Sequence, residues 1–247
     1  MNLTEFFARH PRAALAFSGG VDSAYLLYAA VQCGADVTAY YVKSEFQPAF
    51  EWEDARRLAG ELGARLVEIP LSVLEREEVA ANPPDRCYHC KRAIFGAIAR
   101  RAAADGYDVL LDGTNASDEE GDRPGMRALR EMQVLSPLRL CGLTKADIRR
   151  RSRQAGLFTW EKPAYACLAT RVPTGQAITL EQLGRIERAE GRLHQMGFTD
   201  LRVRVWGRGA RLELPADQLM RAVERREDIL AALGADFAPV TLDLQAR

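Results

Sequence analysis

The chain has 247 residues, of which 47% are hydrophobic, and its 34 basic side chains equal its 34 acidic ones in number. A chain of this size can form one large domain or two small ones around a full hydrophobic core. The balanced charge argues against a nucleic-acid partner, because proteins that bind RNA or DNA usually carry a basic excess.

Targeting segments are not evident in the sequence. It contains no run of 18 apolar residues, which argues against a membrane span. The first ten residues, MNLTEFFARH, lack the basic and then apolar pattern of a secretory signal. Five cysteines, an odd number with one closely spaced pair, indicate metal or redox chemistry in a reducing cytosol rather than a disulfide framework. We therefore expect a cytoplasmic protein with no membrane partner.

The first two thirds of the chain alternate between short apolar or β-branched runs and segments with helical spacing. Helices are predicted over residues 4–9, 24–31, 51–62, 72–78, 86–104 and 145–155, and strands over 13–17, 37–43, 65–69 and 109–112. Residues 118–127 are predicted to form a polar loop and 136–138 a short extended piece. Strands separated by helices indicate an α/β fold, with a doubly wound parallel sheet and helices on both faces.

A domain boundary is predicted in the segment 160–175, where Pro163 and Pro173 rule out a continuous helix. Beyond it, helices are predicted over 180–196 and 217–233, and strands over 201–205, 210–214 and 240–244. The first domain is thus expected to span residues 1–165. The second, a smaller α+β domain, is expected to span residues 175–247.

The segment LAFSGGVDSAYLL, residues 15–27, predicts a strand, a glycine turn and a helix in succession. In this arrangement backbone N–H groups and a helix N-terminus face an anion, and adjacent glycines let the backbone approach a phosphate. Ser18 and Ser23 add hydroxyl donors, and Asp22 is a candidate ligand for a phosphate-bound Mg²⁺. The turn is not a Walker A motif, because no lysine follows the glycines. A tight connection that binds no ligand is the simpler alternative.

Two further residues are expected near this turn. Parallel sheets bind ligands beyond the carboxyl ends of their strands. The second predicted strand ends at Lys43, and the fourth is followed by Gly113. Both residues are therefore candidates for contact with a nucleotide held at the glycine turn.

The cysteines form a second group of candidates. Cys87 and Cys90 make a CxxC pair at the start of a predicted helix, and Cys167 lies far away in the sequence. The pair allows a zinc site, a redox disulfide or part of an iron–sulfur site. Three cysteine ligands suit a four-iron cluster with one iron left open. Three unrelated buried thiols are the simpler alternative, and Cys33 and Cys141 are expected to be inert core residues.

Several motifs follow one another along the chain, namely SGGVDS, CYHCK, TNASDEEGDRPGMRAL with SPL close behind, ACLATRVPTG, LRVR and ARLE. The first matches the PP-loop of the N-type ATP pyrophosphatases, and the series as a whole resembles the LarE-type ATP-dependent sulfur transferases. The resemblance extends from Ala13 to about Leu214. It implies the adenine nucleotide alpha hydrolase-like fold of the PP-loop superfamily.

The resemblance also implies a reaction. Members of this family adenylate a carboxylate of a pyridinium mononucleotide with ATP and Mg²⁺, release pyrophosphate, and leave a thiocarboxylate in the biosynthesis of a nickel-pincer cofactor. The residues that match the nucleotide-binding loop are Ser18, Gly19, Gly20, Asp22 and Ser23.

Four residues of the second predicted domain are candidates, by the same resemblance, for binding the substrate phosphate or a metal ion. Arg202 and Arg204 match arginines near the substrate phosphate, and their alternation on a strand directs them to one face. From the residues alone, an exposed charged edge strand explains them equally well. Glu213 and Asp217 are weaker candidates for a metal site.

Cys167 matches a cysteine that some members of the family sacrifice, giving up its own sulfur so that dehydroalanine remains. Members with a CxxC pair resemble a second type, in which three cysteines hold a 4Fe–4S cluster that relays sulfur. Because this chain carries both features, we favour a cluster on Cys87, Cys90 and Cys167, with Cys167 itself as the alternative sulfur source. Arg171 is a candidate to stabilise the Cys167 thiolate or the charge that develops on the acyl adenylate.

Other functions share parts of this pattern. A tRNA thiolation enzyme should carry a basic RNA-binding extension or further zinc motifs. An amide-forming synthetase of the NAD synthetase or GMP synthetase kind has no use for three cysteines. A nucleotide-binding regulator is a non-enzymatic alternative, which failure to release pyrophosphate would favour. We expect a small-molecule substrate and a homo-oligomer.

Overall fold

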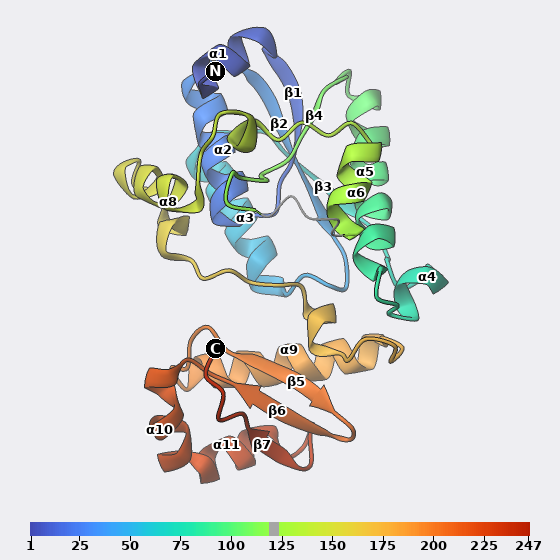
Figure 1. The fold of residues 1–247 in the computed structure, drawn as a ribbon, viewed down its shortest axis with the longest axis vertical. Helices are drawn as coiled ribbons and strands as arrows, with labels where there is room; N and C mark the ends of the chain where they lie inside the picture. Colours follow the sequence, from blue (N-terminus) through green and yellow to red (C-terminus); the bar gives the residue numbers. More distant parts are fainter. Residues whose placement is uncertain (119–123) are drawn as a thin grey trace. The chain divides into compact units, whose positions relative to one another are not determined.

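The computed structural model describes residues 1–118 and 124–247, which divide into two compact units (Figure 1). The first unit consists of Met1–Val73 and Asp85–Lys162, and the second of Leu74–Pro84 and Pro163–Arg247. The segment Leu74–Pro84 joins the second unit because Asn82 is buried there. Its side-chain nitrogen donates to the carbonyls of Pro173, at 2.8 Å, and Gln176, at 3.1 Å. The domain ranges 1–165 and 175–247 stay predictions.

The first unit contains a four-stranded parallel sheet in the order β3-β2-β1-β4. Its strands are β1 (Arg12–Ala16), β2 (Asp36–Lys43), β3 (Leu66–Pro70) and β4 (Leu110–Leu111). Its helices are α1 (Leu3–Arg9), α2 (Val21–Gln32), α3 (Ala49–Glu61), α5 (Arg86–Ala104), α6 (Pro124–Glu131), α7 (Pro137–Leu140) and α8 (Lys145–Gln154), with a 3₁₀ turn at Phe158–Glu161.

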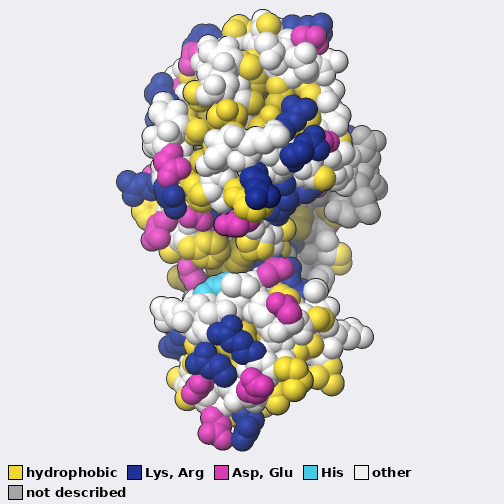
Figure 2. All heavy atoms as spheres, turned by 90° about the vertical axis from the view of Figure 1, so that its left-hand side faces the viewer, with side chains coloured by type: hydrophobic (Ala, Val, Ile, Leu, Met, Phe, Trp, Pro, Cys, Tyr) yellow, Lys and Arg dark blue, Asp and Glu magenta, His cyan; other side chains and the backbone are white. Residues whose placement is uncertain are grey.

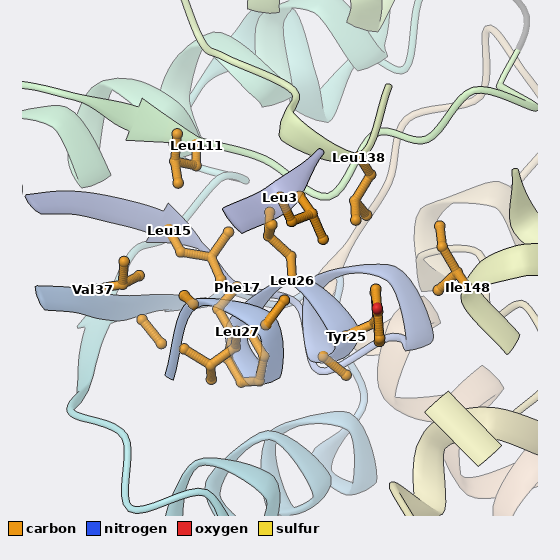
Figure 3. Packing of buried hydrophobic residues seen from close by; sticks show 14 of the residues in the cluster. Leu3, Leu15, Phe17, Tyr25, Leu26, Leu27, Val37, Leu111, Leu138 and Ile148 are labelled. Atoms are coloured by element: carbon orange, nitrogen blue, oxygen red, sulfur yellow. The ribbon is translucent and has the colours of Figure 1, made fainter. Parts of the chain in front are cut away.

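Both faces of this sheet are covered, α2, α3 and α8 lying on one side and α5 and α6 on the other (Figure 1). Successive side chains of a strand point to opposite faces. Leu15 accordingly packs in the main core with Leu26 of α2 (Figure 3), whereas Ala14 and Tyr40 pack on the opposite face with Ile98 of α5. The expected α/β fold with a doubly wound parallel sheet is therefore confirmed.

Three local predictions within the first domain were wrong. Of the helix predicted at 72–78, residues 72–76 are not helical, because the Glu45 carboxylate accepts hydrogen bonds from the Ser72 hydroxyl, at 2.5 Å, and the Val73 amide, at 3.0 Å. The helix in this region is instead α4 (Glu77–Ala80) of the second unit.

The other two wrong predictions concern segments that are helical in the structure. Pro124 begins α6, so residues 124–127 are not part of a polar loop, and residues 119–123 of the predicted loop lie outside the described residues. The predicted extended piece at 136–138 is the start of α7, where Pro137 occupies a first-turn position. Proline is tolerated there because the first helical N–H groups have no partner within the helix. The helix predicted at 24–31 begins earlier, at Val21.

The second unit carries a three-stranded sheet in the order β5-β6-β7, with α9 (Leu180–Gln195) packed against β5. Strands β5 (Arg202–Trp206) and β6 (Gly209–Glu213) form an antiparallel hairpin, and β7 (Val240–Leu242) pairs with β6 in parallel. The segment predicted to lack a continuous helix carries a 3₁₀ turn at Leu168–Arg171.

The helix predicted at 217–233 is two helices, α10 (Ala216–Glu224) and α11 (Arg226–Leu233). The break falls at Arg225, whose φ of −99° and ψ of 22° end one helix and precede the next. Helical spacing continues across the break because both helices bury apolar side chains, so periodicity did not reveal it. The last strand ends at Leu242, two residues before the predicted end.

The surface shown in Figure 2 carries Lys and Arg side chains interspersed with Asp and Glu over each unit. This mixture agrees with the equal numbers of basic and acidic residues in the sequence. Among the described residues, no helix has both the length and the apolar character that crossing a bilayer requires.

Candidate functional site

The glycine turn between β1 and α2 depends on two glycines for its shape. Gly19 has a φ of +73°, in the left-handed region that favours glycine, and Gly20 is the residue before the first turn of α2. A Cβ at Gly19 would lie only 3.0 Å from the Cβ of Ala55 on α3. The turn therefore requires glycine for both its conformation and its packing.

The serines of the turn hold it together. The Ser23 hydroxyl donates to the Gly20 carbonyl, at 3.2 Å, and accepts from the Ser18 amide, at 3.3 Å. The two serine hydroxyls are themselves 3.1 Å apart. The turn is thus shaped in advance, at a point where the unpaired N–H groups at the start of α2 favour an anion.

Gly113 lies directly against this turn. A Cβ built on it would be 2.9 Å from the backbone nitrogen of Ser23 and 3.2 Å from its Cα. The lack of a side chain lets the segment after β4 meet the N-terminus of α2. The structure therefore brings the two predicted nucleotide-binding segments together, although the role of each residue stays a prediction.

Asp22, in the first turn of α2, forms an ion pair that the sequence analysis missed. Lys145 Nζ lies 2.5 Å from Asp22 Oδ2. Burial raises the pKa of Asp22, and the hydrogen bond from Lys145 acts in the opposite direction. Lys145 is the first residue of α8, where the helix dipole disfavours a cation. That unfavourable position is the one signal in the sequence for a partner elsewhere.

The second oxygen of the same carboxylate bears on metal binding. Among the described residues, Asp22 Oδ1 is buried and has no hydrogen-bond partner. A buried carboxylate oxygen without a partner costs free energy unless a ligand satisfies it. Because Mg²⁺ prefers carboxylate and phosphate oxygens, Asp22 Oδ1 is the atom of this turn that would hold a magnesium ion.

Lys43 ends β2 at the carboxyl edge of the sheet, as predicted from its position. Its Nζ lies 3.6 Å from the centroid of the Trp52 ring, an arrangement that holds the ammonium by a cation–π interaction. Its proposed contact with a nucleotide stays a prediction.

The CxxC pair lies on the first turns of α5, so its two side chains are one helical turn apart. Cys87 is exposed and Cys90 half-buried. The next residue, Lys91, is largely buried, and burial lowers its pKa, although Asp112 and both thiols act in the opposite direction. A Cβ at Gly125 would lie 3.1 Å from Lys91 Cδ, so Gly125 makes room for this side chain.

All five cysteines lie among the described residues, and none forms a disulfide. Cys33 and Cys141 pack against the main core of the first unit, and burial raises the pKa of the Cys141 thiol. Cys87 and Cys90 belong to the first unit and Cys167 to the second.

Arg171 and Glu190 hold the backbone around Cys167 within the second unit. The two side chains are fully buried and joined by two hydrogen bonds, Nε to Oε1 at 2.8 Å and Nη2 to Oε2 at 3.1 Å. Arg171 Nη1 donates to the carbonyls of Ala166, at 2.6 Å, and Cys167, at 3.3 Å. The Tyr165 hydroxyl donates to Glu190 at 2.6 Å, and burial raises the pKa of that tyrosine. Arg171 thus contacts the main chain of Cys167 from inside the unit.

Arg202 belongs to the same buried group. It is 4% exposed and donates to the carbonyls of Ala164 and Leu201, each at 2.7 Å. Its guanidinium also lies over the Tyr165 ring, 5.0 Å from the centroid. Burial and the neighbouring Arg171 lower the pKa of Arg202 to about 10. The alternative of an exposed charged edge strand is therefore wrong for Arg202.

Arg204 of β5 and Glu213 of β6 line a cavity of about 530 Å³. Arg204 is hydrogen-bonded to the Glu213 carboxylate and donates to the Thr170 carbonyl at 2.6 Å. Asp217 is exposed in the first turn of α10. No group of three or more His, Cys, Asp or Glu side chains able to hold a metal ion occurs in the part of the chain that the structure describes.

The parallel sheet, the glycine turn after its first strand and the helix that follows define a nucleotide-binding protein of the PP-loop class. The family model described as asparagine synthase matches residues 9–202. An uncharacterized protein of Synechocystis is 36% identical over 99% of this chain and 92% of its own length. The pyridinium-3,5-bisthiocarboxylic acid mononucleotide synthase of Lactiplantibacillus plantarum is 34% identical over 94% of this chain and 86% of its own length.

A more distant match is the tRNA-specific 2-thiouridylase of Frankia alni, 31% identical over 62% of this chain but only 53% of its own length. The chain belongs to the LarE family of PP-loop sulfur transferases. It is accordingly an ATP-dependent sulfur-transferring enzyme.

Proposed function

We propose that this enzyme adenylates a carboxylate of a pyridinium mononucleotide, releases pyrophosphate and converts the carboxylate to a thiocarboxylate for a nickel-pincer cofactor. The observation that carries the proposal is the match over 94% of the chain to a synthase named for a pyridinium mononucleotide with two thiocarboxylic acid groups. The PP-loop geometry supports the first half of this reaction, since it provides a preformed anion site for ATP.

ATP is needed because a carboxylate is a poor electrophile. Direct replacement of its oxygen by sulfur would expel oxide, whereas attack of the carboxylate on the α-phosphorus of ATP forms an acyl adenylate and expels pyrophosphate. The N–H groups at the start of α2, with Ser18 and Ser23, would hold that pyrophosphate. Asp22 Oδ1 would hold a Mg²⁺, which would supply neutralisation of charge on the phosphates. Lys145 opposes the rise in the pKa of Asp22 that burial causes.

Sulfur then has to reach the acyl carbon, and Cys167 is one source. Attack by its Sγ expels AMP and forms a thioester. Removal of the Cα proton of Cys167 then breaks the Cβ–Sγ bond, so that the electron pair leaves with the thiocarboxylate and dehydroalanine remains. Arg171 contributes by holding the main chain of this segment from within the unit, because its guanidinium is buried and bonded to Glu190.

The other source that we propose is a 4Fe–4S cluster on Cys87, Cys90 and Cys167, which would supply sulfide to the acyl adenylate in place of Sγ. The spacing of Cys87 and Cys90 on α5 favours joint ligation. Cys167 is the third ligand that the resemblance to the cluster-bearing members implies.

One experiment distinguishes these routes. The protein is purified without oxygen, its iron and acid-labile sulfide are measured, and its intact mass is recorded before and after turnover with nicotinic acid mononucleotide, ATP and Mg²⁺. Loss of the mass of one H₂S, mapped to Cys167, indicates sacrifice, whereas bound iron with an unchanged mass indicates relay. Cys141→Ser is the matched control, since that thiol packs against the core. Absence of pyrophosphate release and of any thiocarboxylate would contradict the whole proposal.

Thiolation of tRNA is the second candidate, because thiouridylases match about 60% of the chain. Those relatives are matched over only about half of their own length, and this chain carries no net charge. Pyrophosphate release with unmodified tRNA but not with the mononucleotide would favour it.

The location and the oligomeric state of the enzyme are also part of the proposal. A cytoplasmic location is supported by five cysteines without a disulfide. A homo-oligomer is supported by the exposed apolar side chains of Met220, Val223 and Leu230 on α10 and α11. Sedimentation of the purified protein tests the second point directly.

A further inference from the structure

A cavity of about 490 Å³ lies between α2 and α8 of the first unit, and the proposed function makes no use of it. The two helices pack together in the main core, to which Tyr25 of α2 and Ile148 of α8 both belong (Figure 3). The residues that line the cavity are Tyr25, Tyr28, Arg150, Arg151, Gln154 and Ala155. A cavity of this volume is large enough for a small organic ligand.

The chemistry of this lining favours a negatively charged ligand. Of the described residues that line the cavity none is acidic, although the chain as a whole has equal numbers of acidic and basic side chains. Two guanidiniums, two phenol hydroxyls and one amide group can all donate hydrogen bonds, and a guanidinium has no acceptor. Figure 2 faces the side of the first unit on which α8 lies and shows Lys and Arg side chains beside hydrophobic ones there. The cavity therefore suits a ligand rich in acceptor oxygens.

Most of these donors are unused within the chain. In the part of the chain that the structure describes, the Arg151 guanidinium and the hydroxyls of Tyr25 and Tyr28 make no hydrogen bond or ion pair. Tyr25 is only 8% exposed, yet its hydroxyl oxygen is not enclosed by the core, so it lies at the cavity wall. Arg150 donates from Nη2 to Asp147 Oδ1 at 2.6 Å, which leaves its Nε and Nη1 for another acceptor.

We propose that this cavity binds a phosphate monoester of about mononucleotide size. Its phosphate would accept hydrogen bonds from the guanidiniums of Arg150 and Arg151, because phosphate oxygens can accept from two guanidinium groups at once. The hydroxyls of Tyr25 and Tyr28 would donate to the same group. Tyr28 is half-buried, and the two tyrosine rings lie 6.2 Å apart between centroids, so an aromatic edge is available to the organic part of the ligand.

This site is separate from the phosphate-binding turn at the start of α2. An α-helix rises about 1.5 Å per residue, so Tyr28 lies roughly 9 Å along α2 from Asp22. The tyrosines line the flank of the helix, whereas an anion at the turn faces the N–H groups at its first residues. AMP and a substrate mononucleotide, both part of the proposed reaction, are two sources of such a phosphate ester. The binding itself does not depend on that reaction.

Protection of Arg151 from phenylglyoxal tests the proposal, because this reagent modifies accessible guanidiniums. The full-length protein is treated with the reagent at increasing concentrations of AMP, nicotinic acid mononucleotide, inorganic phosphate or adenosine. Modification of Arg151 is followed by peptide mass mapping, which assigns protection to this cavity rather than to the glycine turn. Arg226, whose side chain is 67% exposed in the second unit, is the reference arginine in every sample.

We expect at least one of the two mononucleotides to slow the modification of Arg151 about fivefold or more at saturation, and adenosine to leave it unchanged. The mononucleotide that protects at the lower concentration identifies the source of the phosphate. In Arg150→Gln the concentration for half protection should rise about tenfold or more, because one of two guanidiniums is lost. In Tyr28→Phe it should rise about threefold or more, because one hydroxyl donor is lost.

Arg153→Gln is the matched control for these variants. It removes the same charge from the same helix, but the Arg153 guanidinium lies over the Trp160 ring, 4.8 Å from its centroid, and does not line the cavity. Half protection should therefore stay within about twofold of the parent value.

Four results would overturn the proposal. They are modification of Arg151 at an unchanged rate with both mononucleotides, equal protection by adenosine, a loss in Arg153→Gln as large as that in Arg150→Gln, and protection by inorganic phosphate at the same concentration as by the mononucleotides. The last result would mean that the cavity holds an adventitious ion only. Pyrophosphate release takes no part in these measurements, so failure of the proposed function would leave the site standing.

Discussion

The buried pair of Arg171 and Glu190 allows a quantitative prediction. Replacing Glu190 by glutamine keeps the shape of the side chain but removes the only carboxylate that contacts the Arg171 guanidinium among the described residues. Because Arg171 and Glu190 are 0% and 3% exposed at their side chains, the charge left behind is not solvated by water.

Breaking a buried pair by removing one partner costs about 3–5 kcal/mol. We expect the full loss of unfolding free energy here, since Glu190 also accepts hydrogen bonds from the Tyr165 hydroxyl and from the Val203 amide, the latter at 3.0 Å. A change of 1 kcal/mol shifts the melting temperature of a domain of 60–100 residues by roughly 4–8 °C. We therefore expect Glu190→Gln to lower the melting temperature of the second unit by about 12 °C or more.

Thermal unfolding followed by circular dichroism measures this shift, and hydrogen exchange of residues 166–171 reports the loss of order around Cys167. Glu181→Gln is the matched control, because this glutamate is exposed in the first turn of the same helix and its loss costs less than about 1 kcal/mol. Replacing Arg171 and Glu190 together by leucine should recover part of the stability, as apolar substitutes often do, but not the order at Cys167. A melting temperature within a few degrees of the parent for Glu190→Gln would refute this reasoning.

Three further variants test other parts of the structure. Gly113→Ala introduces a Cβ 2.9 Å from a backbone nitrogen of α2, so pyrophosphate release should fall roughly tenfold or more. The control is Gly60→Ala, at a position on α3 where the new Cβ meets open space, and it should leave pyrophosphate release unchanged. Lys145→Met removes the ammonium that lowers the pKa of buried Asp22. The proposed role of Asp22 as a magnesium ligand requires the ionised carboxylate, so the acidic limb of the pH–activity profile should move to higher pH, and Lys145→Arg should leave it near its original position. Asn82→Ala should destabilise the second unit by about 2–4 kcal/mol in a denaturant titration, because it removes buried hydrogen bonds at a residue with a φ of 55°.

Each of these expectations has a result that would contradict it. Full activity of Gly113→Ala would mean that the segment after β4 moves away without harm to the nucleotide site. An unchanged acidic limb in Lys145→Met would show that Asp22 does not need to be ionised. A stability of Asn82→Ala equal to that of the parent would show that Leu74–Pro84 contributes little to the second unit.

The spacing of apolar residues along the chain was enough to predict the parallel sheet of the first unit. Short β-branched runs alternate with helical spacing because strands and helices bury residues at different periods, and the parallel sheet follows from that alternation. The turn SGGVDS could be read in the same way, since Gly19 needs a left-handed φ and α2 begins directly after Gly20. The helix break at Arg225 escaped this approach because the apolar spacing continues across it.

Contacts between distant segments needed the tertiary structure. Lys145 reaches Asp22 over 123 residues, and Asn82 joins the second unit through carbonyls 91 and 94 residues away. Arg202 and Arg204 look equivalent in the sequence, yet one is buried against Ala164 and the other lines a cavity. The sequence therefore determined the strands of the parallel sheet, most of the long helices and the position of the glycine turn, because these depend on neighbouring residues. Packing decided which charges are buried and paired, because that depends on segments the chain brings together only when it folds.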